Sequence, residues 1–284
     1  MDININGHAA DVTLENEKTV GEVMASLDQW LAASGHRLSG ISIDGQTAHT
    51  SLLDDFFSRE INSVNKLDLY TSSLAELTAE SLLNILYDIK EFEKLGFEEK
   101  KNFFSDWKKS AQANFIAEQI PDLYNIFTNS FSGGDINPGS LFSITEERLR
   151  EVKDPMAEYL NIRPLLEDTC TRLSNLALDI QTGKDAQAAR SIQLFSGVSE
   201  KILRIIRHLD MQGYLYNGAN GEKPFIKVIG EFGSLIKELL DAYERHDTVL
   251  AGDLAEYEAV PKIQELYNAI IKNCSQKTAV QDEK

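Results

Sequence analysis

The feature that most constrains this chain is a change in the spacing of its apolar side chains near residue 72. Before that point apolar and polar residues alternate, and after it apolar residues recur every three or four positions. Alternation is the period of a strand, and the longer spacing is the period of a helix. A chain of 284 residues is also long enough for about two domains. The sequence therefore predicts an α+β protein, with an N-terminal sheet domain followed by an all-helical region.

The first 72 residues predict a small β domain. Residues 2–6 and 10–14 alternate around Asn6-Gly7, which is typical of a β-hairpin. Thr19 is then expected to cap a helix that ends at Ser34-Gly35. The apolar positions of this helix are Val20, Val23, Met24, Leu27, Trp30 and Leu31. A third strand over 38–43 ending at Asp44-Gly45, a short helical turn over 52–57 and a last strand over 65–70 complete the expected domain.

This order of elements resembles the β-grasp fold of ubiquitin and of the prokaryotic sulfur carriers. Those proteins act through a free C-terminal Gly-Gly, whereas here the last strand runs on into Thr71 and the chain continues. The Gly133-Gly134 pair lies far inside the sequence. The resemblance therefore implies a binding or docking module instead of a conjugated modifier.

The remaining chain is divided by its composition into an aromatic-rich helical segment, 73–134, and a helical bundle, 135–284. The boundary is placed in the loop 132–140, which is rich in glycine and proline, although a tight internal loop would have the same composition. The bundle is expected to contain two helical hairpins, with turns at residues 183–185 and 245–247. Pro261 is expected to kink the last helix.

The two hairpins align at an offset of 62 residues, which suggests an internal repeat. The offset pairs Leu173 with Leu235, Phe195 with Tyr257, and Val198 with Val260. Any two helices of a bundle share apolar positions at such spacing, so a duplication and a chance match are both consistent with this pattern.

The charge of the chain excludes several classes of partner. A formal net charge of −17 opposes binding to nucleic acid and to anionic membranes. No uncharged apolar run reaches the roughly 20 residues needed to span a bilayer, and the N-terminus lacks the basic and apolar regions of a signal peptide. We therefore expect a cytoplasmic protein without membrane insertion.

The sequence offers no recognisable catalytic, cofactor-binding or metal-binding residues. The five histidines are scattered, no Glu has a His three residues later, and nucleotide-binding glycine motifs are absent. Cys170 and Cys274 lie in apolar helical patterns, which is typical of buried structural thiols. Glu256 and Glu258 flank Tyr257, and could act as acid and base only if buried. The prediction is a protein that is not an enzyme and needs no cofactor.

Without a reactive centre, the sequence favours a protein–protein interaction or adaptor role, with another protein as the partner and homo-oligomers left open. The order of helix, Gly-Tyr-Leu-Tyr loop and helix over 201–257 is similar to flagellar export chaperones, which implies a helical binder of a disordered segment. An enzyme whose site is assembled from distant positions is the other alternative. As a whole, the chain resembles uncharacterised bacterial proteins with a β-grasp start and a helical end.

Overall fold

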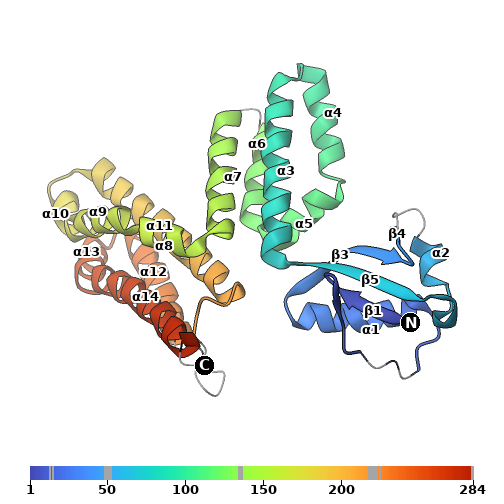
Figure 1. Cartoon of the computed structure of the whole chain (residues 1–284). Coiled ribbons are helices and arrows are strands. Elements are labelled where there is room, and N and C mark those ends of the chain that lie inside the picture. The colour runs from blue at the N-terminus through green and yellow to red at the C-terminus, as the bar shows by residue number, and fades with distance from the viewer. Residues whose placement is uncertain are drawn as a thin grey trace. The chain divides into compact units, whose positions relative to one another are not determined.

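The computed structural model confirms the α+β class. It describes residues 1–12, 14, 16–47, 53–133, 137–216, 223 and 225–282. A mixed sheet lies in the N-terminal part, and the described elements from residue 74 onward are helices (Figure 1). The chain forms two compact units, residues 1–149 and 150–284. The predicted boundary at 134/135 lies outside the described residues, so the division into 1–72, 73–134 and 135–284 stays a prediction.

The N-terminal domain, here called the head (residues 1–73), contains five paired strands among the described residues, in the order β2-β1-β5-β3-β4. Its elements are β1 (Asp2–Ile5), β2 (His8–Ala9), α1 (Val20–Ala33), β3 (His36–Ile43), β4 (Gln46–Thr47), α2 (Leu53–Phe57), a 3-10 turn (Ile61–Ser63) and β5 (Lys66–Ser73). Strands β1 and β5 are parallel, and the other paired strands are antiparallel. The order of elements is the one expected from the sequence, except that β4 and the 3-10 turn were not predicted.

The turns of the head form at dipeptides whose residues tolerate a positive backbone φ. Asn6 and Gly7 have φ of 50° and 83°, and Asp44 and Gly45 have φ of 49° and 82°. Consecutive positive values are those of the tight hairpin turns that Asn-Gly and Asp-Gly favour. Thr19 caps α1 in a reciprocal capping box with Glu22. Buried side chains of α1 pack against Leu67 and Leu69 of the sheet.

Two details of the head differ from the prediction. The second hairpin strand contains only His8 and Ala9, and the chain leaves the sheet afterwards, so Val12 is 38% exposed. Trp30 was expected on the buried stripe of α1, but its side chain is 59% exposed while the adjacent Leu31 is buried. Neighbouring helix residues point about 100° apart, so a stripe that includes both must leave one at its margin. The predicted Leu52 lies outside the described residues.

The helices between the head and residue 149 include a cluster of aromatic rings. They are α3 (Leu74–Lys94), α4 (Phe97–Trp107), α5 (Ala111–Gln119), α6 (Pro121–Gly133) and α7 (Pro138–Lys153), which runs on into the second unit. Phe92 contacts Phe131 edge to face, with ring centroids 4.5 Å apart, and Trp107 packs against Phe127 at 5.7 Å. The aromatic-rich segment is thus held together by offset and edge contacts between rings.

The second unit is a helical bundle with one continuous core. Its helices are α8 (Pro155–Asn161), α9 (Arg163–Ser174), α10 (Leu176–Gln181), α11 (Asp185–Met211), α12 (Phe225–Glu244), α13 (Thr248–Asp253) and α14 (Val260–Asp282). The core includes Phe195 and Phe232, whose rings meet edge to face at 6.2 Å. Gly252 of α13 lies so close to α10 that an added Cβ would sit 2.8 Å from the Ala177 side chain.

The two predicted hairpin turns share one hydrogen-bond pattern, but at a different offset. Gly183 and His246 both have positive φ, and the next residue in each turn donates its amide to a carbonyl five positions earlier. These turns correspond at an offset of 63 residues, not 62. Tyr257 is 68% exposed whereas its proposed counterpart Phe195 is fully buried. The 62-residue alignment therefore does not bring the two turns into correspondence, and it pairs a buried side chain with an exposed one at Phe195 and Tyr257.

A π-helical turn (Leu254–Ala259) joins α13 to α14 and ends just before Pro261. The amide of Val260 donates to the carbonyl of Ala255, five residues earlier. Proline lacks an amide hydrogen and its ring crowds the preceding turn, and a wider turn is one way in which a helix accommodates this. Pro261 thus follows a π turn inside a helical run.

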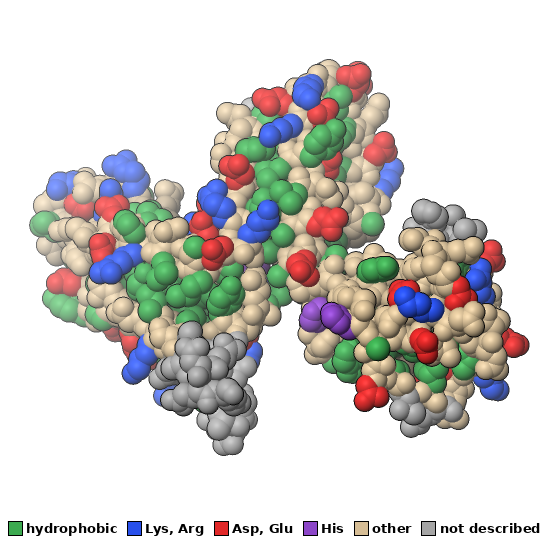
Figure 2. All heavy atoms as spheres, in the orientation of Figure 1, with side chains coloured by type: hydrophobic (Ala, Val, Ile, Leu, Met, Phe, Trp, Pro, Cys, Tyr) green, Lys and Arg blue, Asp and Glu red, His purple; other side chains and the backbone are tan. Residues whose placement is uncertain are grey.

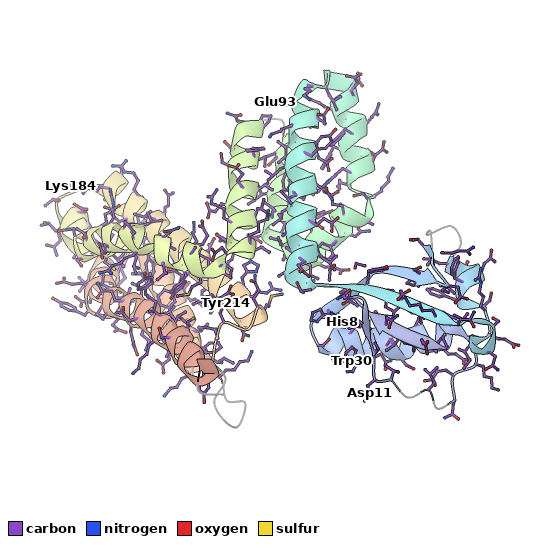
Figure 3. All side chains as sticks on the ribbon, viewed as in Figure 1. His8, Asp11, Trp30, Glu93, Lys184 and Tyr214 are labelled. Atoms are coloured by element: carbon purple, nitrogen blue, oxygen red, sulfur yellow. The ribbon has the colours of Figure 1, made fainter. Side chains whose placement is uncertain are left out.

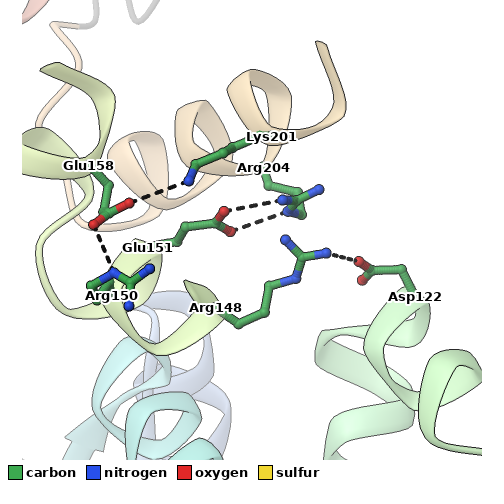
Figure 4. Close-up of polar contacts among 7 residues, drawn as sticks. All are labelled: Asp122, Arg148, Arg150, Glu151, Glu158, Lys201 and Arg204. Atoms are coloured by element: carbon green, nitrogen blue, oxygen red, sulfur yellow. Dashed lines mark hydrogen bonds and ion pairs between the residues drawn. The ribbon is translucent and has the colours of Figure 1, made fainter. Parts of the chain in front are cut away.

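Ion pairs organise the first helices of the bundle (Figure 4). Glu151 is fully buried and accepts two hydrogen bonds from Arg204, from Nε at 3.2 Å and from Nη2 at 3.1 Å. Glu158 pairs with Arg150 at 3.1 Å and with Lys201 at 3.5 Å. These contacts join α8 and the end of α7 to α11.

Candidate binding groove in the head

An open apolar hollow of the head lies between α1 and the chain that follows β1. This hollow, here called the head groove, has a volume of about 650 Å³. One wall is formed by Val23, Ser26, Leu27 and Trp30 of α1, and the other by residues 8–12 with Leu14 and Glu17. Figure 3 shows His8, Asp11 and Trp30 along the same edge of the head, on β2, the following segment and α1.

The helical wall follows from the spacing of its residues. Positions 23, 26, 27 and 30 are three, four and seven apart, so they share one face of α1. Val23 and Leu27 are buried at 1% and 5% exposure, while Trp30 is 59% exposed. Val23 and Leu27 therefore belong to the core of the head and form the base of the groove. Trp30 lies at the rim, where its large apolar side chain contacts solvent.

The second wall exists because β2 is short. Ala10 still donates its amide to the Ile3 carbonyl, and Ala10 and Leu14 pack against the head core. Val12 does not join them and remains exposed. A longer second strand would have used this segment to extend the sheet, whereas its early end leaves an apolar hollow beside the sheet edge.

The rim of the groove is acidic. Asp11 and Glu17 line it, and no Lys or Arg is among the lining residues that the structure describes. Glu17 accepts a hydrogen bond from Ser26 Oγ at 3.3 Å, which holds the carboxylate beside α1. On the face of the head drawn in Figure 2, hydrophobic side chains reach the surface among acidic ones. A cationic group near the rim would therefore be favoured electrostatically.

The sheet face opposite α1 is polar and internally paired. Asp68 accepts a hydrogen bond from Asn4 Nδ2 at 2.8 Å and pairs with Lys66 Nζ at 2.8 Å. These contacts, the one with Lys66 foremost, lower the pKa of the Asp68 carboxyl, and the hydrogen bond with Asp68 raises the pKa of Lys66. Tyr70, two residues after Asp68 on β5, lies on the same face and is 50% exposed, so this face also presents an aromatic side chain.

The bundle has a hollow of about 350 Å³ between its two hairpin turns. Asp185, His246 and Asp247 line it together with Tyr243 and Thr248. All three ionisable side chains are exposed, and Asp247 is engaged in capping α13 through a hydrogen bond from the Leu250 amide at 3.1 Å. This is an open surface hollow, and exposed carboxylates keep their hydration there.

The residues considered for chemistry at the sequence level do not converge. Glu256 and Glu258 are exposed on the π turn, where solvent screens them. His8 lines the head groove, His246 lines the bundle hollow, and His49 lies outside the described residues. Cys170 and Cys274 are buried, and burial raises the pKa of the Cys170 thiol. Among the described residues, no group of His, Cys, Asp and Glu has the arrangement of a metal site.

Sequence reasoning missed the head groove because it treated Trp30 as core and Val12 as strand. One signal was present: Trp30 lies at the margin of the α1 stripe, on the opposite side from Met24, when residues are spaced at 100°. A large aromatic side chain at such a margin is easily left in contact with solvent. The early end of β2 had no corresponding signal, because residues 10–14 alternate as a strand would.

Comparisons with known proteins match the head and part of the bundle to two separate families. Residues 1–73 match a family described as the TP0873 N-terminal domain, and residues 159–269 match a domain of unknown function (DUF8042). An uncharacterized protein from Treponema pallidum (strain Nichols) is 21% identical over 271 residues, covering 95% of this chain and 96% of the relative. No solved structure matches the chain.

These matches place the head groove inside the region that resembles the first family. They extend over most of the chain, since the bacterial relative aligns from the head into the bundle. Neither family description names ubiquitin, a sulfur carrier or a flagellar chaperone. Within the described ranges, no helix combines the length and the apolar character that a membrane crossing requires.

Proposed function

We propose that this chain is a non-catalytic, cytoplasmic adaptor that binds another protein through the head groove. The observation that carries the proposal is the exposure of Trp30 and Val12 above an apolar floor, at the edge of a folded domain. Exposed apolar surfaces framed by polar residues are characteristic of interaction sites. Tryptophan is also among the residues that contribute most to binding at protein interfaces.

Trp30 can supply a substantial share of the binding energy. Aromatic side chains bury about 150–250 Å² when fully covered, and 59% of Trp30 is exposed. Covering that share at about 25 cal/mol per Å² corresponds to about 2–4 kcal/mol. Truncating Trp30 should therefore weaken partner binding by at least about tenfold.

The β-grasp resemblance supports a docking role for the head. The mixed sheet with parallel β1 and β5, and α1 packed against it, supports this resemblance. The chain continues from β5 directly into α3 through a capping box of Ser73 and Glu76. A strand that continues into a helix is not a free tail for conjugation, so we propose that the head acts by binding.

An affinity purification of the full chain from its native cells tests this function. Wild type is compared with Trp30→Ala and with Tyr87→Ala, a control on α3 whose side chain is 65% exposed and lies outside the groove. We expect one protein to be captured by wild type and by the control, and to be depleted at least about tenfold with Trp30→Ala. Equal capture by all three baits would refute the proposal.

A second candidate is a chaperone-like helical binder, as the sequence of 201–257 suggests. Exposed apolar side chains in this segment favour it, including Ile226 at 56% and Val249 at 71% exposure. Figure 2 also shows hydrophobic side chains gathered on the drawn face of the bundle. Under this alternative, a purification from flagellated cells recovers a flagellar component with the Trp30→Ala bait as well as with wild type. Recovery of no flagellar component would remove it.

A further inference from the structure

We propose that the occupant of the head groove is an extended, basic segment of the partner protein, which adds a strand to the outer edge of β2. This inference rests on the proposed function and specifies the chemistry of the partner. Three observations carry it: the open edge of β2, the alternation of side chains at that edge, and the charge of the rim.

The edge of the sheet is open next to the groove. Strand β2 ends the strand order, and its paired neighbour among the described strands is β1. An edge strand presents backbone amides and carbonyls that can pair with an added strand. Main-chain pairing of this kind gives affinity, while pockets beside the edge select alternate side chains.

The pairing of β1 and β2 aligns the groove with an added strand. Ile5 is directly opposite His8, so these two side chains lie on the same face of the sheet. That face is the one covered by α1, since Ile5 packs against the head core with Leu27. Every second side chain of a strand added beside His8 would therefore point toward α1, over Leu27 and Trp30. The occupant should have apolar residues at alternate positions.

The charge of the rim favours basic residues at both ends of the bound segment. Asp11 and Glu17 line the groove, and its described lining residues include no Lys or Arg. The whole chain carries a formal net charge of −17, so its long-range field adds to the attraction of cations. Lysine or arginine on either side of the apolar positions would meet this rim, and acidic flanks would be repelled.

Synthetic peptides test the inference on the full chain. The parent peptide has three valines at alternate positions, threonines between them and two lysines at each end. A second peptide replaces the lysines with glutamates. Two more carry N-methyl groups, either on the valine amides or on the threonine amides, because only one of these sets can face β2 in an added strand.

Binding is measured by the anisotropy of labelled peptides and by tryptophan emission. Trp107 is 9% exposed, so a shift to shorter wavelength on binding reports the covering of Trp30. We expect the parent peptide to bind wild type, and the glutamate peptide to bind at least about tenfold more weakly. One N-methylated peptide should bind as the parent and the other should lose binding. The Asp11→Asn variant should weaken the parent peptide and reduce its salt dependence.

Any of three results would overturn the inference. Equal binding of the lysine and glutamate peptides would exclude charge selection, and equal binding of both N-methylated peptides and the parent would exclude strand addition. If no peptide binds but Trp30→Ala still reduces capture of the partner protein, a basic strand-like segment is rejected as the occupant and the proposed function stands. If capture is also insensitive to Trp30→Ala, the proposed function fails as well.

Discussion

Replacing Glu151 with alanine should destabilise the bundle more than removal of an ordinary surface charge. The Glu151 side chain is fully buried, and both of its oxygens accept hydrogen bonds from Arg204. The Arg204 side chain is 23% exposed, so its guanidinium would stay largely buried without the Glu151 carboxylate. Removing one partner of a buried ion pair costs about 3–5 kcal/mol. Because Arg204 retains some contact with water, we expect the lower end, about 3 kcal/mol.

Hydrogen exchange of the α11 amides is the suitable assay, because both tryptophans lie in residues 1–149 and do not report on the bundle. A loss of about 3 kcal/mol corresponds to exchange about a hundredfold faster for the amides that open with the whole unit. The matched control is Glu167→Ala, which removes an exposed ion pair with Arg163 and should change the exchange rates little, because solvent screens this pair. If both variants accelerate exchange equally, the reasoning about burial is wrong.

Three further predictions concern packing, capping and thiol burial. Gly252→Ala should destabilise the bundle by about 1–3 kcal/mol in thermal unfolding, because the new methyl group would clash with α10. The control is Gly233→Ala on α12, where the new methyl group has no neighbour within 4 Å and should stabilise the bundle by up to about 1 kcal/mol. Hydrogen bonds from the Ser73 amide and hydroxyl lower the pKa of Glu76. Their contribution to the stability of the folded chain should therefore be complete above the ordinary pKa of glutamate, and should be lost as the pH falls through the lowered pKa. An NMR titration that finds an ordinary pKa for Glu76 would contradict this. Burial raises the pKa of Cys170, so its thiol should react with a disulfide reagent in denaturant and only slowly in the native protein, as counted by absorbance.

The sequence predicted the elements of the fold where local chemistry is strong. Asn6-Gly7 and Asp44-Gly45 could be recognised because few other dipeptides tolerate two positive φ values, and Thr19 because its side chain can cap a helix. The change of apolar period near residue 72 located the end of the sheet. These signals depend on residues close to one another in the chain.

The candidate site depends on contacts that local patterns do not contain. Residues 10–14 alternate like a strand, yet tertiary packing draws Ala10 and Leu14 to the core and leaves Val12 outside. The π turn before Pro261 likewise changes the register of the last helix, which the 62-residue alignment could not anticipate. The head groove arises from one strand that ends early beside one helix margin, and neither feature is visible in periodicity alone.

Hydrogen–deuterium exchange of the full chain, alone and with the partner recovered by affinity purification, distinguishes binding in the head groove from binding elsewhere. Binding in the head groove predicts slower exchange of the backbone amides over residues 8–12 and over the second half of α1. Protection confined to residues 201–257, with the amides at 8–12 exchanging as in the free chain, would contradict the account.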